Sequence, residues 1–374
     1  MTTQTALVFG GGGARAAYQV GILKAIVQFY PRNHAIPFGI VAGTSAGAIN
    51  ATSIATHASC FHLGVRKLEW VWRHIHAAQV YQCSHFQIGK HLLNKLLTGL
   101  QGNHIYREAP SLMNNEPLRH LLNQLIDFKR IDRNIHHQVL TALSIDTSSY
   151  NSGRSTSFFQ GQNHINNWQR ANRDGTRALI TTEHLMASSA IPLIFPSIKL
   201  KQGYYGDGSV HQLSPLSSPI HLGANKIMVL NLDSPHKSMS KAMSQHPSSA
   251  DIGGHLLDTI FSDTLNSDLE RLTRVNQTLK YMTKEQQQTH HLRPIETLVI
   301  KPSEDLTDIA KHYFSDIPPA VRLLLRTIGI NKNSDSSIIS YLLFEKNYTG
   351  QLIDLGYQDA MCQIDEIKQF FAIG

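Results

Sequence analysis

The chain has 374 residues, of which 41% are hydrophobic, so it can bury a large core in one large domain or two ordinary ones. Lys and Arg outnumber Asp and Glu by 34 to 27, a charge of +7 that suits phospholipid headgroups and nucleic acid equally. The basic residues are dispersed, with no Lys/Arg-rich run, aromatic stacking motif or zinc-finger spacing. This pattern argues against a nucleic-acid partner.

The cysteines and histidines give no sign of a metal site or a disulfide framework. Cys60, Cys83 and Cys362 are odd in number and widely spaced. The 21 His are scattered, without His-Glu-x-x-His or comparable ligand spacing. We therefore expect free thiols, no metal and no cofactor.

The sequence predicts neither a Sec signal peptide nor a membrane span. The first residues run directly into a strand-like segment, without the basic and apolar regions of a Sec signal peptide. The most apolar long stretch, 185–200, is interrupted by Pro192 and Pro196 and is too short for a transmembrane helix. We expect a cytoplasmic protein whose membrane contact, if any, is peripheral.

The first 60 residues alternate between strand-like and helix-like segments. In chain order, the predicted elements are a strand over 5–9, a helix over 14–29, a strand over 39–42 and a helix over 48–58. Four glycines follow the first strand, and a sharp Gly-x-Ser-x-Gly turn follows the second. This order predicts a parallel αβ sheet with sites at the C-terminal ends of its strands.

The rest of the chain mixes helices and strands. The predicted elements are helical segments over 65–125, a helix start at Asn115 and Glu116, strands over 139–146 and 155–159, a helix over 185–195 that ends at Pro192, strands over 200–205 and 226–231, a linker over 234–251, a polar interruption over 285–291 and mainly helices beyond Pro302.

The turn Gly43-Thr44-Ser45-Ala46-Gly47 matches the nucleophile elbow, in which a strained turn lifts a serine hydroxyl above the sheet. A small-residue packing turn is the alternative interpretation. The position between an apolar strand and a small-residue helix is the context that the motif requires.

The loop Gly11-Gly12-Gly13-Ala14-Arg15-Ala16 ends the first strand, where its backbone N–H groups can hold an oxyanion. The same glycines also satisfy the dinucleotide fingerprint. No Asp or Glu occurs before Glu69, so the acidic residue that would bind the ribose is missing. This absence disfavours a nucleotide site.

A third element is Gly206-Asp207-Gly208, a carboxylate between glycines after a strand. On its own it is an ordinary Asp-Gly turn. Its value lies in its combination with the early serine elbow and the glycine loop, which makes Asp207 a candidate partner of Ser45. A rival assignment uses His211, four residues later, as the base of a triad.

These motifs together resemble the bacterial patatin-like phospholipase family. The resemblance rests on the glycine loop, on residues 43–50, on Ala187-Ser188-Ser189-Ala190-Ile191-Pro192 and on residues 206–208, within roughly 5–232. It implies a three-layer αβα fold with a mainly parallel central sheet. The implied organisation is a catalytic domain over 1–232 and a mainly helical C-terminal extension over 233–374 packed on the core.

The resemblance also implies chemistry: a serine carboxylic ester hydrolase of phospholipase A or lysophospholipase type, with a catalytic dyad of Ser45 and Asp207. The implied roles are an oxyanion hole at Gly11, Gly12 and Gly13, and supporting positions at Arg15, Gly43, Gly47 and Gly208. Arg15 would orient either the glycine loop or a substrate phosphate. Because a free Asp has a pKa of about 3.9, we expect Asp207 to be shielded from water.

Two residues in the motifs depart from the family pattern: Ala16 stands where the family usually has Gly, and Ser209 stands where Gly or Ala is usual. They leave open a second hypothesis, a catalytically inactive lipid-binding or scaffold protein of the same fold. The expected partner in either case is a lipid at a membrane or micelle surface. The apolar stretch 185–198 suits an acyl-chain site or plain core, and the basic amphipathic segment 320–330 suits a membrane interface or packing on the core.

Overall fold

The computed structural model describes residues 4–82, 111–201, 203–212, 214–233, 264–290, 292–327 and 337–373. The predicted linker over 234–251 lies outside these residues. The helix start predicted at Asn115 and Glu116 is confirmed, because α6 begins at Glu116 with Asn115 as its N-cap.

The strands are β1 (Thr5–Phe9), β2 (Ile40–Thr44), β3 (Ala142–Ser149), β4 (Arg154–Gly161), β5 (Trp168–Gln169), β6 (Arg173–Arg177), β7 (Ile198–Leu200), β8 (Gly203–Asp207), β9 (Lys226–Leu230) and β10 (Glu296–Ile300). The α-helices are α1 (Ala17–Ile26), α2 (Ala46–Thr56), α3 (Phe61–Arg73), α4 (Ala77–Val80), α6 (Glu116–Leu125), α7 (Lys129–His136), α8 (Thr182–Ser188), α9 (Ser217–His221), α11 (Thr264–Leu279), α12 (Lys284–Thr289), α13 (Leu306–His312), α14 (Pro319–Thr327), α15 (Ile338–Leu342), α16 (Lys346–Cys362) and α17 (Ile364–Phe371). Short 3-10 helices are η1 (Gly13–Ala16), η2 (Val27–Phe29), η3 (Gly208–Val210) and η4 (Phe314–Asp316).

The central sheet has the strand order β10-β9-β1-β2-β3-β4-β6-β5. From β10 to β3 all neighbouring strands are parallel, whereas β4 runs antiparallel to β3. The hairpin of β7 and β8 adds to the end of β3, where Asp207 lies opposite Thr147. The prediction of an α/β fold with a mainly parallel sheet is confirmed.

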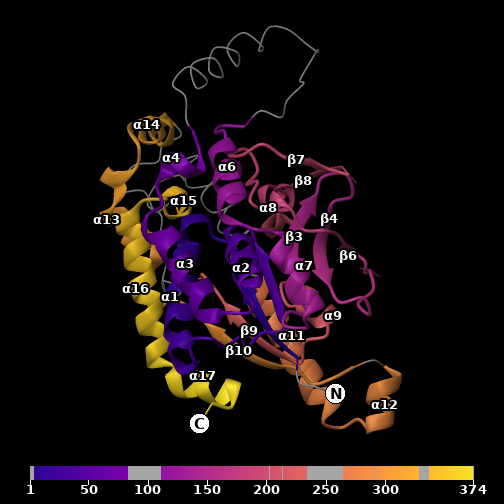
Figure 1. The fold of residues 1–374 in the computed structure, drawn as a ribbon. Helices are drawn as coiled ribbons and strands as arrows, with labels where there is room; N and C mark the ends of the chain where they lie inside the picture. Colours follow the sequence, from indigo (N-terminus) through magenta and orange to yellow (C-terminus); the bar gives the residue numbers. More distant parts are fainter. Residues whose placement is uncertain are drawn as a thin grey trace, which may run out of the picture.

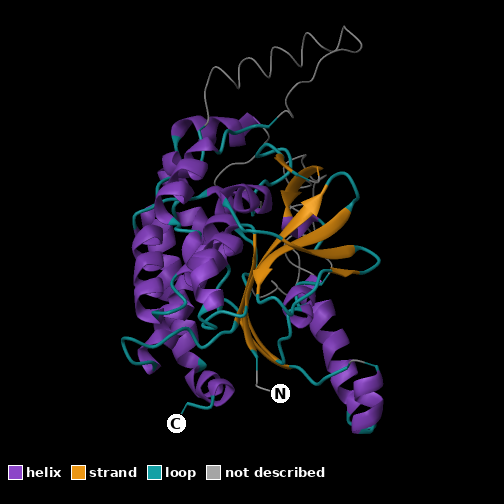
Figure 2. Cartoon of the chain, turned by 45° about the vertical axis from the view of Figure 1, so that its right-hand side comes forward, coloured by secondary structure: helices purple, strands orange, loops and turns teal. Residues whose placement is uncertain are grey.

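Helices cover both faces of this sheet, which makes three layers (Figures 1 and 2). On one face, alternate residues of β1, β2, β3 and β9 pack in a large core with α1, α2, α3, α8 and the C-terminal helices. On the other face, the intervening residues of the same strands pack with residues around α9 and with α11. The period-2 alternation of each strand thus supplies both cores.

Residues beyond 232 contribute a strand as well as helices. The strand β10 pairs in parallel with β9, an element that the sequence pattern did not predict. Helix α16 packs closely on α1, because a Cβ on Gly21 would lie 2.0 Å from the Ile353 carbonyl oxygen and one on Gly356 2.1 Å from that of Tyr18. The division into domains at 232 stays a prediction.

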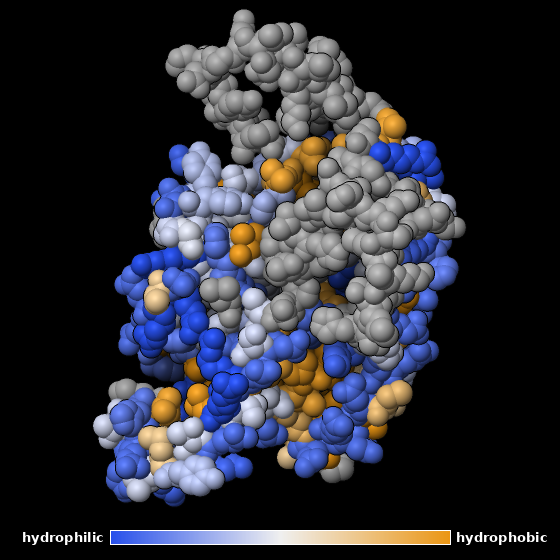
Figure 3. All heavy atoms as spheres, turned by 180° about the vertical axis from the view of Figure 1, so that it is seen from behind, coloured by the Kyte–Doolittle hydropathy of each residue, from blue (hydrophilic) through white to orange (hydrophobic). Residues whose placement is uncertain are grey.

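Two local predictions differ from the structure. Helix α8 ends at Ser188, before the predicted end at Pro192, and the chain from 198 to 207 forms a hairpin in place of a single strand. No helix in the described part of the chain is long and apolar enough to cross a membrane. Seen from behind, the described surface is mainly hydrophilic, with a hydrophobic patch low in the view (Figure 3).

Candidate active site

Ser45 occupies the sharp turn between β2 and α2. Its backbone has φ 55° and ψ −129°, a strained conformation for a residue with a side chain, and its N–H donates to Ser188 Oγ at 2.9 Å. A Cβ on Gly43 would lie 2.4 Å from the Gly47 carbonyl oxygen, and one on Gly47 would lie 2.5 Å from that of Phe9. Glycines at these two positions therefore permit the tight turn.

Asp207 ends β8, and its side chain is 0% exposed, which confirms the expected shielding from water. Its Oδ1 atom accepts a hydrogen bond from the Ser209 N–H at 3.0 Å. Its Oδ2 atom has no hydrogen-bond partner among the described residues. The following Gly208 is required by space, because a Cβ there would lie 2.3 Å from the Asp146 carbonyl oxygen.

The pKa of Asp207 is raised to about 6 because the group is buried. The neighbouring Ser45 hydroxyl and the Ser209 groups offset part of the effect of burial. A carboxylate with this pKa is a better base near neutral pH than a free Asp. No hydrogen bond of normal geometry joins the Ser45 hydroxyl to Asp207. Such bonds are often long in enzymes without substrate and shorten when substrate binds.

The glycine loop lies against the serine. A Cβ on Gly11 would lie 3.2 Å from Ser45 Cβ and 2.8 Å from Ser209 Oγ. None of the N–H groups of Gly11, Gly12 and Gly13 donates a hydrogen bond to a described residue. These donors are therefore free to bind an anion beside Ser45.

Arg15 connects this loop to the C-terminal helices. Its Nε atom donates to Ser340 Oγ at 2.6 Å, its Nη2 atom donates to Thr307 Oγ1 at 2.9 Å, and its guanidinium lies 4.1 Å above the ring of Tyr341. Gly13 has φ +56°, and a Cβ there would lie 2.3 Å from the Tyr341 carbonyl oxygen. Helices α13 and α15 thus hold the loop from residues about 300 positions away in sequence.

A chain of buried side-chain hydrogen bonds holds Gly10, the residue before the glycine loop. The sequence motifs did not reveal it. Trp72 Nε1 donates to Asn50 Oδ1 at 2.9 Å, and Asn50 Nδ2 donates to Gln19 Oε1 at 2.9 Å. Gln19 Nε2 in turn donates to the Gly10 carbonyl at 2.9 Å. The signal available in the sequence was the polar Asn50 in a helix of small residues.

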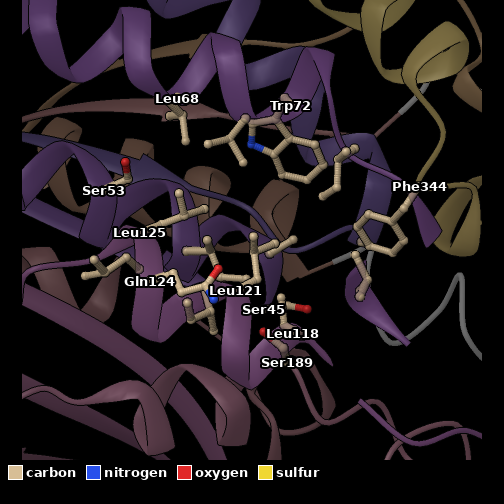
Figure 4. A pocket seen from close by; sticks show the side chains of 18 of the residues that line it. Ser45, Ser53, Leu68, Trp72, Leu118, Leu121, Gln124, Leu125, Ser189 and Phe344 are labelled. Atoms are coloured by element: carbon tan, nitrogen blue, oxygen red, sulfur yellow. The ribbon is translucent and has the colours of Figure 1, made fainter. Parts of the chain in front are cut away.

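A mainly apolar cavity of about 330 Å³ adjoins Ser45. Figure 4 shows Ser45 next to Ser189 and Leu118, with Ser53 and Leu68 farther along the cavity. The apolar lining comprises Ile49, Leu68, Val71, Trp72, Ile75, Val80, Leu118, Leu121, Leu122, Leu125, Ile126, Ile191, Phe195 and Phe344. The stretch 185–198 supplies only part of it; α2, α3 and α6 supply most of the rest.

His211 does not take part in this arrangement. It lines a different cavity, together with Asp146, and its Nδ1 atom has no partner among the described residues. Within the described part of the chain, no histidine is hydrogen-bonded to Ser45 or Asp207. The geometry therefore favours Asp207 over His211 as the group next to the serine.

The sequence matches the family model "Patatin-like phospholipase" over residues 7–220, more than half of the chain. The chain belongs to this family. The match includes Ser45, Asp207 and the glycine loop, whereas the patatin-like phospholipase model ends before Thr307 and Tyr341, which hold that loop here.

The relatives of this chain match only in part. Patatin-like phospholipase domain-containing protein 7 is 42% identical in Rattus norvegicus and 40% identical in Mus musculus, each over 65 residues, which are 17% of this chain and 4% of the relative. Among solved structures, VipD from Legionella pneumophila has a TM-score of 0.37 at 11% identity, covering 97% of this chain and 67% of VipD. The type III effector ExoU has a TM-score of 0.33 at 12% identity, and the match covers 94% of this chain and 53% of ExoU.

Proposed function

We propose that this protein is a lipid acyl hydrolase that cleaves carboxylic esters, with Ser45 as nucleophile and Asp207 as base. The observation that carries the proposal is the apolar cavity that adjoins Ser45, beside loop N–H groups that donate to no described residue and a buried carboxyl with a raised pKa. The family match supports lipid acyl chemistry for such a site.

In the first step, Ser45 Oγ attacks the ester carbonyl carbon while Asp207 Oδ2 accepts the hydroxyl proton. The carbonyl oxygen becomes an oxyanion that the N–H groups of Gly11, Gly12 and Gly13 stabilise. When the tetrahedral intermediate collapses, the bond to the leaving alcohol breaks and Asp207 returns the proton to that alcohol. The product is an acyl ester on Ser45.

In the second step, water attacks the acyl ester. Asp207 accepts a proton from the water, the same loop stabilises the second oxyanion, and Ser45 leaves with the proton that Asp207 returns. The fatty acid is released and the enzyme is restored. One carboxyl thus serves both half-reactions as base and then as acid.

The supporting residues hold this geometry. We assign Gly43 and Gly47 to the tight turn at Ser45 and Gly208 to the close approach of the Asp207 loop to β3. Arg15 positions the glycine loop, because its guanidinium is occupied by Ser340, Thr307 and the ring of Tyr341. These contacts favour the loop over a substrate phosphate as its partner.

We further propose a membrane or micelle surface as the place where substrate is taken up. Leu112 N–H donates to the Leu193 carbonyl at 2.9 Å, and the two side chains are 36% and 76% exposed. Phe195, two residues later, lines the cavity. Exposed leucines beside the cavity wall suit insertion into a lipid interface.

A fluorophosphonate probe and a panel of esters test the proposal. Wild type, Ser45→Ala and the control His211→Ala are incubated with the probe, p-nitrophenyl octanoate and mixed phospholipid vesicles. We expect labelling and hydrolysis by wild type and His211→Ala, and neither by Ser45→Ala. A wild type that is neither labelled nor active would instead support the lipid-binding scaffold.

A further inference from the structure

A second cavity, of about 430 Å³, lies away from Ser45 and is lined by polar groups. It is bounded by β3, β4, the β5–β6 turn, the segment after Asp207, α9 and α11, which gather on one side of the molecule (Figure 1). Its lining residues are Asp146, Ser155, Ser157, Trp168, Arg170, Ala171, Asn172, Arg173, His211, Gln212, Ser214, Ser217, Ser218 and Arg271. The proposed hydrolysis uses none of them.

Three guanidinium groups give this cavity a positive field. Arg173 Nε has no hydrogen-bond partner among the described residues. Among the described residues, the guanidinium of Arg170 donates only to the neighbouring Gln169 carbonyl. Arg271 Nη1 lies 3.9 Å from Asp268 Oδ1, and the oxygens of Asp268 already accept from the Ser214 hydroxyl and the Leu216 N–H. The pKa of nearby His221 is lowered mainly by burial, and the charges of Arg170 and Arg173 lower it further.

The residues that line the cavity also include a buried serine whose hydroxyl has no partner among the described residues. Ser218 is 3% exposed, and its Oγ atom makes no hydrogen bond to any described residue. Burying a polar group without a partner is costly, so a hydroxyl of this kind in a cavity wall is available to bind a ligand. The carboxyl present, Asp146, is already engaged, because it accepts from Ser157 at 2.5 Å and from Gln212 at 2.6 Å.

We propose that this cavity binds a phosphate group, free or as part of a phosphate-bearing headgroup. Guanidinium forks and serine hydroxyls are the donors that bind phosphate oxygens best. The volume leaves room for more than a single phosphate. Because Ser45 adjoins the other cavity, the site is separate from the one in which the acyl ester reacts.

The cavity is connected to the serine through Asp146. Thr44, the residue before Ser45, donates to Gln212 Oε1 at 3.0 Å, and Gln212 donates to Asp146. Ser188 Oγ accepts from the Ser45 N–H and donates to the Asp146 carbonyl at 2.6 Å. A ligand that moves this network therefore changes the rate at Ser45, a consequence that rests on the proposed function.

Calorimetry with pyrophosphate tests the site at constant ionic strength. Wild type is expected to bind one equivalent, and Arg173→Gln and Arg271→Gln to bind about tenfold more weakly, the loss for one charge-assisted hydrogen bond. The matched control Arg274→Gln, on the same helix outside the cavity lining, should stay within about twofold. Ser218→Ala should weaken binding about threefold without a change of charge, and thermal unfolding verifies that each variant is folded.

Sedimentation with phosphatidylcholine vesicles that contain phosphatidic acid distinguishes the source of the phosphate. Vesicle binding that pyrophosphate displaces assigns the site to a lipid headgroup; binding of pyrophosphate without displaceable vesicle binding assigns it to a soluble phosphate ester. Binding of neither probe overturns the proposal, as does an equal loss in Arg271→Gln and Arg274→Gln. Since binding is measured directly, an absence of ester hydrolysis would contradict the proposed function alone.

Discussion

Asp207 and Asp146 are two buried carboxyls at the same end of the sheet, and burial raises the pKa of each to about 6. Asp146 accepts hydrogen bonds from Ser157, Gln212 and Thr44, whereas Asp207 accepts from the Ser209 N–H and keeps Oδ2 without a partner among the described residues. A raised pKa alone therefore does not make a base. The proposed role of Asp207 as base rests in addition on its oxygen without a described partner and on the nearby Ser45 hydroxyl.

The cavities beside these carboxyls differ in the same way. The cavity at Ser45 is lined by aliphatic and aromatic side chains from α2, α3 and α6, and the cavity at Asp146 by serines and arginines. One suits an acyl chain and the other suits an anion. Changes at the two carboxyls and in the two cavities test whether this division holds.

The largest expected effect is on hydrolysis. Asp207→Asn removes the base and, like Ser45→Ala, should lower kcat/KM by at least about a thousandfold. Asp146→Asn keeps the shape of the side chain. Because Asp146 is not the proposed base, kcat/KM of this variant should fall by no more than about tenfold. The rates of p-nitrophenyl octanoate hydrolysis decide this. A larger loss in Asp146→Asn than in Asp207→Asn would reverse the assignment.

The next effect is on stability. Because the pKa of Asp207 is raised above the unfolded value, the folded state loses stability as pH rises through about 6. Asp207→Asn avoids this loss and should raise the free energy of unfolding at pH 7.5 by on the order of 2 kcal/mol, with no gain at pH 4. Urea unfolding at both pH values measures it.

Asp146→Asn is the matched control for that measurement. Its new amide N–H₂ would face Gln212 Nε2 and the Thr44 hydroxyl, which donate to the carboxyl in the wild type. The increase in the free energy of unfolding should therefore be smaller for Asp146→Asn than for Asp207→Asn. An equal gain in both variants would mean that hydrogen-bond partners do not separate the two carboxyls.

The third effect is the acid limb of the pH profile. The base acts as a carboxylate, so kcat/KM should fall about tenfold per pH unit below the apparent pKa of about 6. Asp146→Asn should keep this limb in place. If the limb disappears in Asp146→Asn, then Asp146 and not Asp207 controls the ionisation that limits the rate.

Much of this site was predictable because its signals are local. A buried strand followed by glycines, and an elbow of small residues around Ser45, are fixed by backbone sterics within a few positions. The isolation of Asp207 from water followed from the base role that the family resemblance implies, since a base near neutral pH needs a raised pKa. These inferences required no knowledge of distant residues.

The parts that escaped prediction depend on distant partners. Nothing near Arg15 indicates that Ser340 and Tyr341 hold it, and the short strand β10 is recognisable only through its pairing with β9. Likewise, Arg170 and Arg271 are about a hundred residues apart and meet only in the folded chain. Local patterns do not encode which elements become neighbours.

The smallest expected effect concerns chain length, and it tests the apolar cavity directly. Leu121 lines that cavity on α6 and is only partly buried, so Leu121→Trp fills space without replacing a core side chain. The ratio of p-nitrophenyl palmitate to p-nitrophenyl butyrate hydrolysis should fall on the order of fivefold, because the indole excludes the distal part of a long chain. The matched control is Asn172→Trp, which places an indole at the polar cavity and should leave the ratio unchanged. An equal fall in both variants would mean that the two cavities do not divide acyl and anion binding between them.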